Sequence, residues 1–161
     1  MSALEYDAIV VGARCAGAAT ALLLARKGYR VLAVDRATFP SDTVSPHLIH
    51  PPGGDALRRW GLLDSVTATG CPAIHTYAFD FGPFTLTGSP GADRADVAYA
   101  PRRTVLDKIL IDAASAAGVE VLGRLGAKAF PPEVVNSRGA FTNAIALFPQ
   151  VDVRPLPGLL L

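Results

Sequence analysis

Residues 7–36 read DAIVVGARCAGAATALLLARKGYRVLAVDR. Tyr6 to Val11 is a short apolar run rich in β-branched residues, which is typical of a buried parallel strand. Ala16 to Ala25 consists almost entirely of Ala and Leu, which favours a helix that ends at Lys27-Gly28. A second apolar strand is expected over Tyr29 to Asp35. A strand, a helix and a strand within about 30 residues predict a right-handed βαβ unit with parallel strands.

The turn between the first strand and the helix is Gly12-Ala13-Arg14-Cys15-Ala16-Gly17. Gly12 allows a tight turn, and Gly17 lets the helix pack closely on the strand. The backbone N–H groups and the positive dipole at this helix start are suited to a pyrophosphate. Asp35 closes the second strand, where a carboxylate is able to accept hydrogen bonds from ribose hydroxyls. The pattern predicts a Rossmann-like dinucleotide-binding unit, with a glycine-rich turn of another α/β fold as the alternative.

Arg14 occupies the position of the middle glycine in the G-x-G-x-x-G fingerprint. That glycine normally lets the backbone approach a phosphate. We therefore expect the Arg14 side chain either to point away from the crowded turn or to reach over the phosphates and pair with them.

The rest of the chain predicts shorter elements. We expect a long loop over Arg36 to Pro52, helices over Gly53 to Trp60, Leu62 to Thr67 and Arg103 to Ala117, antiparallel strands over Ile74 to Asp80 and Phe84 to Thr87, and a third parallel strand over Val119 to Leu122. The expected fold class is α/β, with a parallel sheet and a small antiparallel β insertion.

Composition narrows the class of protein. Half of the 161 residues are hydrophobic, 18% are charged, and the net charge is +1, so neither disorder nor nucleic-acid binding is expected. Cys15 and Cys71 suggest no disulfide framework, and no apolar stretch is long enough to cross a membrane. We expect a cytoplasmic protein. His47 and His50 lie in a proline-containing loop with no further ligand cluster, so no metal site is predicted.

Three segments resemble one family in the right order. Residues 7–36, SDTVSPHLIHPPGGDALRRWGLLD (residues 41–64) and PRRTVLDKILIDAASAAGVEV (residues 101–121) are similar to the N-terminal part of FAD-dependent aromatic hydroxylases and geranylgeranyl-reductase-like flavoproteins. The resemblance extends from about Tyr6 to Leu122, and GARCAG matches one branch of that superfamily.

The resemblance implies FAD as the cofactor and assigns roles to individual residues. Gly12, Ala13, Cys15, Ala16 and Gly17 would line the pyrophosphate, with Arg14 among them. Asp35 would bind the adenosine ribose, and Arg36 would lie beside the adenine. Arg103 would contact the FAD phosphates or ribose, while Ser45 and His47 would lie on the loop that approaches the flavin. A solvated surface charge is the alternative for Arg103. No catalytic acid or base is assigned, because the flavin performs the redox chemistry in this family.

The resemblance ends near Arg124. We expect an incomplete FAD-binding domain over residues 1–124 and an irregular, proline-rich tail over residues 125–161. The family's second FAD motif, Gly-Asp-Ala-Ala or similar, is not recognisable, which suggests a truncation or a frame change.

Three functions remain open at this point. The first is an FAD-dependent oxidoreductase that takes electrons from NAD(P)H and acts on a small organic substrate. The second is a truncated FAD-binding fragment with little or no turnover. The third is an NAD-binding domain of a dehydrogenase, which Asp35 permits.

Overall fold

The chain forms two compact units, one made of residues 1–41 with 110–161 and the other of residues 42–109. The computed structural model describes residues 4–45, 47–92, 96–124 and 144–153.

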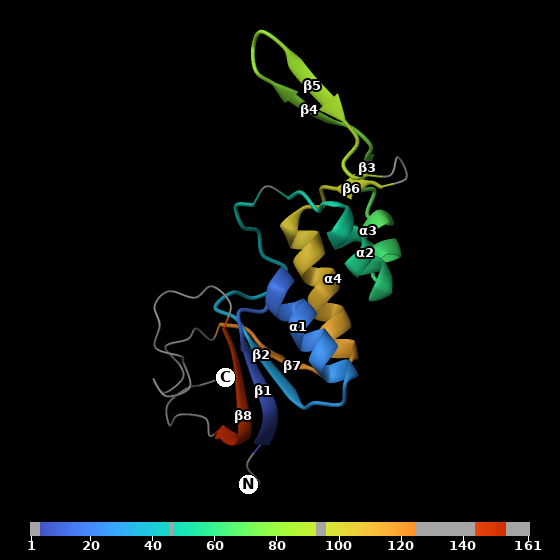
Figure 1. Ribbon diagram of the computed structural model, residues 1–161. Coiled ribbons are helices and arrows are strands. Elements are labelled where there is room, and N and C mark those ends of the chain that lie inside the picture. Colours follow the sequence, from blue (N-terminus) through green and yellow to red (C-terminus); the bar gives the residue numbers. More distant parts are fainter. Residues whose placement is uncertain (1–3, 46, 93–95, 125–143, 154–161) are drawn as a thin grey trace. The chain divides into compact units, whose positions relative to one another are not determined.

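The first unit contains the predicted βαβ arrangement. Strand β1 (Leu4–Val11) leads through helix α1 (Cys15–Arg26) into strand β2 (Val31–Val34). β1 and β2 are parallel, with Ala8 opposite Val31 and Val11 opposite Val34. Strand β7 (Glu120–Leu122) pairs with β2 in parallel, so the expected third parallel strand is confirmed. Figure 1 shows α1 beside these strands.

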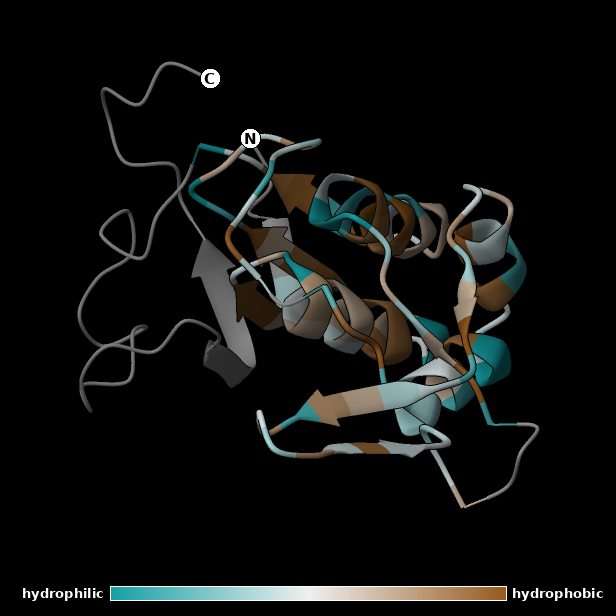
Figure 2. Ribbon diagram, turned by 90° about the horizontal axis from the view of Figure 1, so that it is seen from above, coloured by the Kyte–Doolittle hydropathy of each residue, from teal (hydrophilic) through white to brown (hydrophobic). Residues whose placement is uncertain are grey.

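The core of this unit lies between apolar strands and α1. All four residues of β2 are buried, as expected of a parallel strand covered on both faces. One face of the sheet contributes a cluster of Tyr6, Ile9, Leu32 and Val34. Ala21 and Leu22 of α1 are fully buried. Apolar residues, brown in Figure 2, gather along these strands and on α1.

A fourth strand, β8 (Ala144–Val153), lies in the segment that was predicted to be an irregular tail. It pairs antiparallel with β1, from Leu4 opposite Val153 to Val11 opposite Ala144, and the sheet order is β7-β2-β1-β8. The sequence left the structure of residues 125–161 uncertain, and residues 144–153 of this segment form a strand. Residues 125–143 and 154–161 lie outside the described residues, and the domain boundary at Arg124 stays a prediction.

The second unit begins with two short helices, α2 (Pro51–Arg59) and α3 (Leu63–Thr67). Both were predicted, but α2 starts two residues earlier than expected. Its first residue is Pro51, and proline is well suited to a first helical turn because the amide there has no intrahelical partner. The helix α4 (Arg103–Ala116), also predicted, begins in this unit and ends in the other.

Two small antiparallel pairs complete the second unit. The expected strand over Ile74 to Asp80 is divided into β3 (Ala73–Ile74) and β4 (Tyr77–Asp80). β4 pairs with β5 (Thr85–Gly88), as predicted, whereas β3 pairs with β6 (Ala98–Tyr99), which was not predicted. The β4–β5 hairpin exposes more than half of four apolar side chains, those of Phe79, Phe81, Phe84 and Leu86.

Candidate functional site

The turn from β1 to α1 requires glycine at both of its ends. Gly12 has a positive φ of 94°, a conformation that residues with a Cβ rarely adopt. Its amide donates to the carbonyl of Val34 at 2.7 Å, which ties the end of β1 to β2. A Cβ on Gly17 would lie 1.6 Å from the carbonyl oxygen of Gly12. The turn and the helix are therefore packed backbone against backbone, as the sequence predicts.

The start of α1 has no side-chain cap. Its N-cap residue is Arg14, which has extended backbone angles and makes no side-chain cap hydrogen bond. The first turn of the helix contains no acidic residue. The first intrahelical bond runs from the amide of Ala18 to the carbonyl of Arg14 at 2.7 Å. Since the first N–H groups of a helix have no intrahelical partner, this end is suited to an anion.

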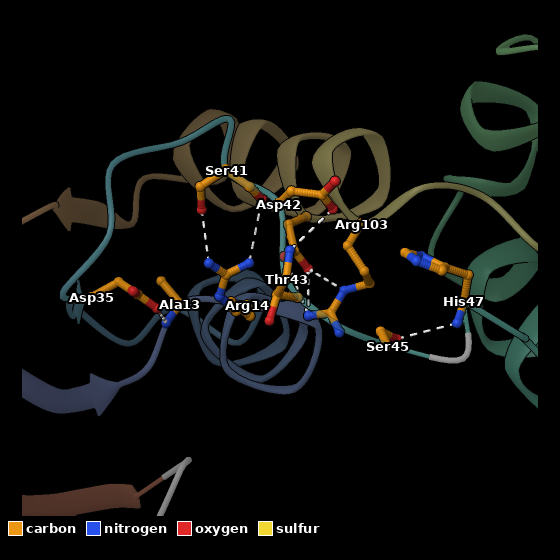
Figure 3. A network of polar contacts seen from close by, with 10 residues as sticks. Ala13, Arg14, Asp35, Ser41, Asp42, Thr43, Ser45, His47 and Arg103 are labelled. Carbon is orange, nitrogen blue, oxygen red and sulfur yellow. Dashed lines mark hydrogen bonds and ion pairs between the residues drawn. The ribbon is translucent and has the colours of Figure 1, made fainter.

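Asp35 is buried, with 6% of its surface exposed, directly after β2. One carboxylate oxygen accepts a hydrogen bond from the amide of Ala13 at 2.8 Å, and the other accepts from the amide of Ala37, also at 2.8 Å. Figure 3 shows the contact with Ala13. The carboxylate thus connects the glycine-rich turn with the loop that follows β2. The sequence analysis missed this structural role because it assigned Asp35 to the ribose alone.

Arg14 contacts the same loop. Its guanidinium donates to the hydroxyl oxygen of Ser41 at 2.7 Å and to the carbonyl oxygen of Ser41 at 3.4 Å. The guanidinium carbon lies 5.4 Å from the centre of the Phe39 ring, within range of a cation–π contact. Of the two orientations expected for this side chain, the structure has the one that leaves the turn, and Figure 3 shows it between Ala13 and Ser41.

In the second unit, Arg103 forms an ion pair with a buried carboxylate one helical turn away. Its Nε and one terminal nitrogen donate to Oδ1 of Asp107 at 3.1 and 3.0 Å, and the terminal nitrogen also lies 3.2 Å from Oδ2. The side chain of Arg103 is 16% exposed and that of Asp107 is fully buried. Arg103 is therefore not a solvated surface charge. Asp107 follows Arg103 by four residues within the segment PRRTVLDKILIDAASAAGVEV, and this helical spacing was the available signal for the pair.

The loop before α2 borders an open surface depression of about 540 Å³, lined by Asp42, Thr43, Val44, Ser45 and His47. His47 has a positive φ of 57°, and its amide donates to the Ser45 hydroxyl oxygen at 3.2 Å. Its Nδ1 is buried and has no hydrogen-bond partner within the described part of the chain. At the other end of the loop, a hydrogen bond from Arg102 lowers the pKa of Asp42 below its usual range.

The two units hold different parts of the expected site. The turn from Gly12 to Gly17, Asp35 and the exposed Arg36 belong to the first unit, whereas His47 and Arg103 belong to the second. Within the described residues, no group of three or more His, Cys, Asp or Glu side chains is placed to hold a metal ion. His50 is instead hydrogen-bonded to the Tyr77 hydroxyl at 2.9 Å. Among the described helices, none is both long and apolar enough to cross a membrane.

A family model described as "FAD binding domain" matches residues 5–133. Squalene epoxidase from Candida albicans is 34% identical over 83 residues, which cover 50% of this chain and 17% of that protein. Squalene monooxygenase from Eremothecium gossypii is 44% identical over 61 residues, which cover 38% of this chain and 12% of that protein.

Among solved structures, the myxobacterial chondrochloren halogenase, described as FAD-dependent, matches with a TM-score of 0.65 and 26% identity. The match covers 74% of this chain and 28% of the halogenase chain. The chain therefore spans less than a third of the length of each of these three proteins.

Proposed function

The chain belongs to the family of FAD-binding domains, and from this membership we propose that it works as the cofactor-binding part of a monooxygenase-type flavoprotein oxidoreductase. FAD is the cofactor of this family. The observation that carries the proposal is the cradle between Gly12 and Gly17, where a side chain on Gly17 would collide with the Gly12 carbonyl.

The start of α1 fits the pyrophosphate of FAD. The helix has neither a side-chain cap nor an acid in its first turn, so a diphosphate meets no repulsion from the helix itself. We assign the pyrophosphate to this end, at the backbone of residues 15–17. The Ala13 amide already donates to Asp35. Ala13 would therefore stabilise the turn, and its N–H would contribute less to phosphate binding than the N–H groups of residues 15–17.

Asp35 remains our assignment for the adenosine ribose. Each carboxylate oxygen accepts one backbone hydrogen bond, which leaves lone pairs for a ribose hydroxyl. Arg36, exposed next to it, would lie beside the adenine. A buried carboxylate that is held at both oxygens keeps its orientation before a ligand arrives, which lowers the entropic cost of binding.

In the second unit, Arg103 and His47 are the proposed contacts to the cofactor. Asp107 holds the Arg103 guanidinium in one orientation while leaving part of it exposed. The Nδ1 atom of His47, buried without a partner in the described structure, is available to a bound group. Bound FAD supplies the redox chemistry, and these residues would orient it and exclude water.

For the whole protein we propose NAD(P)H as the electron donor and a small organic molecule as the substrate. A cytoplasmic location stays a prediction. FAD binding without turnover is the second function left open by the sequence. The third function considered from the sequence, an NAD-binding dehydrogenase domain, fits less well because the family's cofactor is FAD.

The test is the visible absorption spectrum of the purified protein, with and without added FAD, followed by desalting. Retained flavin bands are the expected result. Oxidation of NADH or NADPH by the loaded protein then separates an enzyme from a binding module. A protein that retains no flavin and does not alter the fluorescence of added FAD contradicts the proposal.

A further inference from the structure

Arg14 replaces a glycine at the position where the fingerprint brings backbone close to phosphate, yet its side chain is engaged elsewhere. Its guanidinium donates two hydrogen bonds to Ser41, one to the hydroxyl and one to the carbonyl oxygen. The Phe39 ring lies 5.4 Å from the guanidinium carbon. The residue that departs from the pattern is therefore a connection between the N-cap of α1 and the loop after β2.

The same loop is held at two further points within the first unit. The amide of Ala37 donates to Oδ1 of Asp35 at 2.8 Å. On the side of β7, Gly123 lies so close that an added Cβ would be 3.0 Å from the carbonyl oxygen of Ala37. Residues 36–41 contain no helix or strand, so these contacts replace the restraint that regular secondary structure would supply.

The position of this loop matters because it directly follows Asp35. Residues 36–41 are all exposed or half-buried, so they form a surface next to the proposed ribose and adenine contacts. A loop that is already ordered loses less conformational entropy when a ligand binds. The guanidinium fork of Arg14 is well suited to this task, since it donates to two oxygens of one residue in a fixed geometry.

We propose that Arg14 is a positioning residue that braces the Phe39–Ser41 loop and thereby preforms the adenosine-diphosphate subsite of the cofactor. This inference rests on the proposed function, which supplies the ligand. It explains the departure from G-x-G-x-x-G: Arg14 stands in place of the middle glycine, and its side chain orders the loop that follows Asp35.

The decisive variant is Arg14→Gly, which restores the glycine fingerprint. If Arg14 is merely tolerated, this variant binds at least as well as the original chain. If Arg14 braces the loop, we expect the Kd for ADP and for FAD to rise about tenfold, the change typical of one lost charge-assisted hydrogen bond. ADP is the main probe because it tests this subsite without the flavin ring. Arg26→Ala, which removes an exposed arginine from the other end of α1, controls for the lost charge.

Two further variants distinguish the loss of the hydrogen bonds to Ser41 from the loss of the positive charge. Arg14→Lys keeps the positive charge but loses the fork, and we expect it to resemble Arg14→Gly. Ser41→Ala removes only the hydroxyl acceptor, so its effect should be smaller and should largely disappear in the Arg14→Gly background. Wild-type affinity in Arg14→Lys would overturn the inference.

A measurement without ligand makes the test independent of cofactor binding. Hydrogen exchange of the apo protein should accelerate in peptides that cover residues 36–41 when Arg14 is replaced by Gly, and not in Arg26→Ala. Unchanged exchange there overturns the brace. Faster exchange with unchanged ADP affinity overturns its role in the subsite. If the original chain binds neither ADP nor FAD, the proposed function fails together with the subsite, while the exchange data still report whether Arg14 orders the loop.

Discussion

The carboxylate of Asp35 accepts a hydrogen bond from the backbone amide of Ala13 at 2.8 Å, across 22 residues of sequence. The bond joins the carboxyl ends of two neighbouring parallel strands, the edge at which ligands bind in open α/β sheets. It also fixes the turn that leads into α1. The residue proposed to bind ribose is therefore also a structural part of the phosphate-binding turn, and a change at Asp35 should affect both.

We predict that Asp35→Asn lowers the free energy of unfolding by about 1–3 kcal/mol, because the new amide group points an N–H donor at a backbone donor in a buried site. Affinity for FAD should fall as well. Chemical denaturation and flavin fluorescence measure the two effects. The matched control is Asp42→Asn, at an exposed carboxylate paired with Arg102, where the change should stay within about 0.5 kcal/mol. Equal stability of the two variants would contradict the prediction.

Gly17→Ala should damage the turn severely. The new Cβ would overlap the Gly12 carbonyl oxygen at 1.6 Å, so α1 or the turn has to move. We expect a loss of at least about 1–3 kcal/mol of stability, the usual cost of overpacking, and loss of FAD binding. Gly88→Ala is the control, since nothing lies within 4 Å of an added Cβ there. Thermal melting of both variants checks this, and normal FAD affinity in Gly17→Ala would refute the close packing.

Asp107→Ala should be the most destabilising single change in α4. It leaves the Arg103 guanidinium, 16% exposed, without the carboxylate that it contacts, and breaking a buried pair costs about 3–5 kcal/mol. The double variant Arg103→Met with Asp107→Leu should be more stable than Asp107→Ala, because no unpaired charge remains. Asp112→Ala, at an exposed position of the same helix, serves as the control. Additive effects in a double-mutant cycle would show that the pair contributes no coupling.

The hydroxyl of Tyr6 should ionise at a higher pH than that of an ordinary tyrosine. Burial, followed by the hydrogen bond to Glu120 and the charge of that residue, raises the pKa of Tyr6 from 10.0 to about 12. Because the pKa is higher in the folded state, the associated stability is fully present below pH 10 and is lost as the pH rises through about 12. Tyr6→Phe should therefore remove this part of the alkaline loss of stability.

The measurement for Tyr6 is the ultraviolet absorbance of tyrosinate during alkaline titration, together with denaturation at several pH values. Tyr29→Phe, which changes a tyrosine that is 51% exposed, should leave the late ionisation in place. If the ionisation at high pH persists in Tyr6→Phe, another tyrosine is responsible for it, and its assignment to Tyr6 is wrong.

The βαβ unit could be predicted because its signals are local. Apolar runs, an Ala- and Leu-rich helix and a glycine at each end of the turn all act within a few residues of each other. Strand β8 could not be predicted in the same way. Its place next to β1 depends on pairing with residues far away in the sequence, and its own sequence contains Pro149, which weakens the local strand signal although proline is tolerated in an edge strand such as β8. The two-residue strand β6 is too short to carry a period.

The sequence predicted which residues belong to the candidate site. Their hydrogen-bond and ion-pair partners became known only from the structure. The sequence places Asp35 at the end of β2, but a carboxylate there serves a ribose and a backbone amide equally well. Arg14 was left with two possible directions, and only the positions of Phe39 and Ser41 decide between them. For the pair of Arg103 and Asp107, helical spacing alone would have sufficed, since they are four residues apart.

The pairing of β1 with β8 affects the order in which this protein is made. One edge of β1 is covered by residues 144–153, which lie far from it in the sequence. On the ribosome, that edge of β1 therefore stays unpaired until residues 144–153 have been synthesised. Such late, long-range pairing slows folding and exposes strand edges to other chains. The demand for chaperones and the yield of folded protein should depend on how soon β8 becomes available to pair with β1.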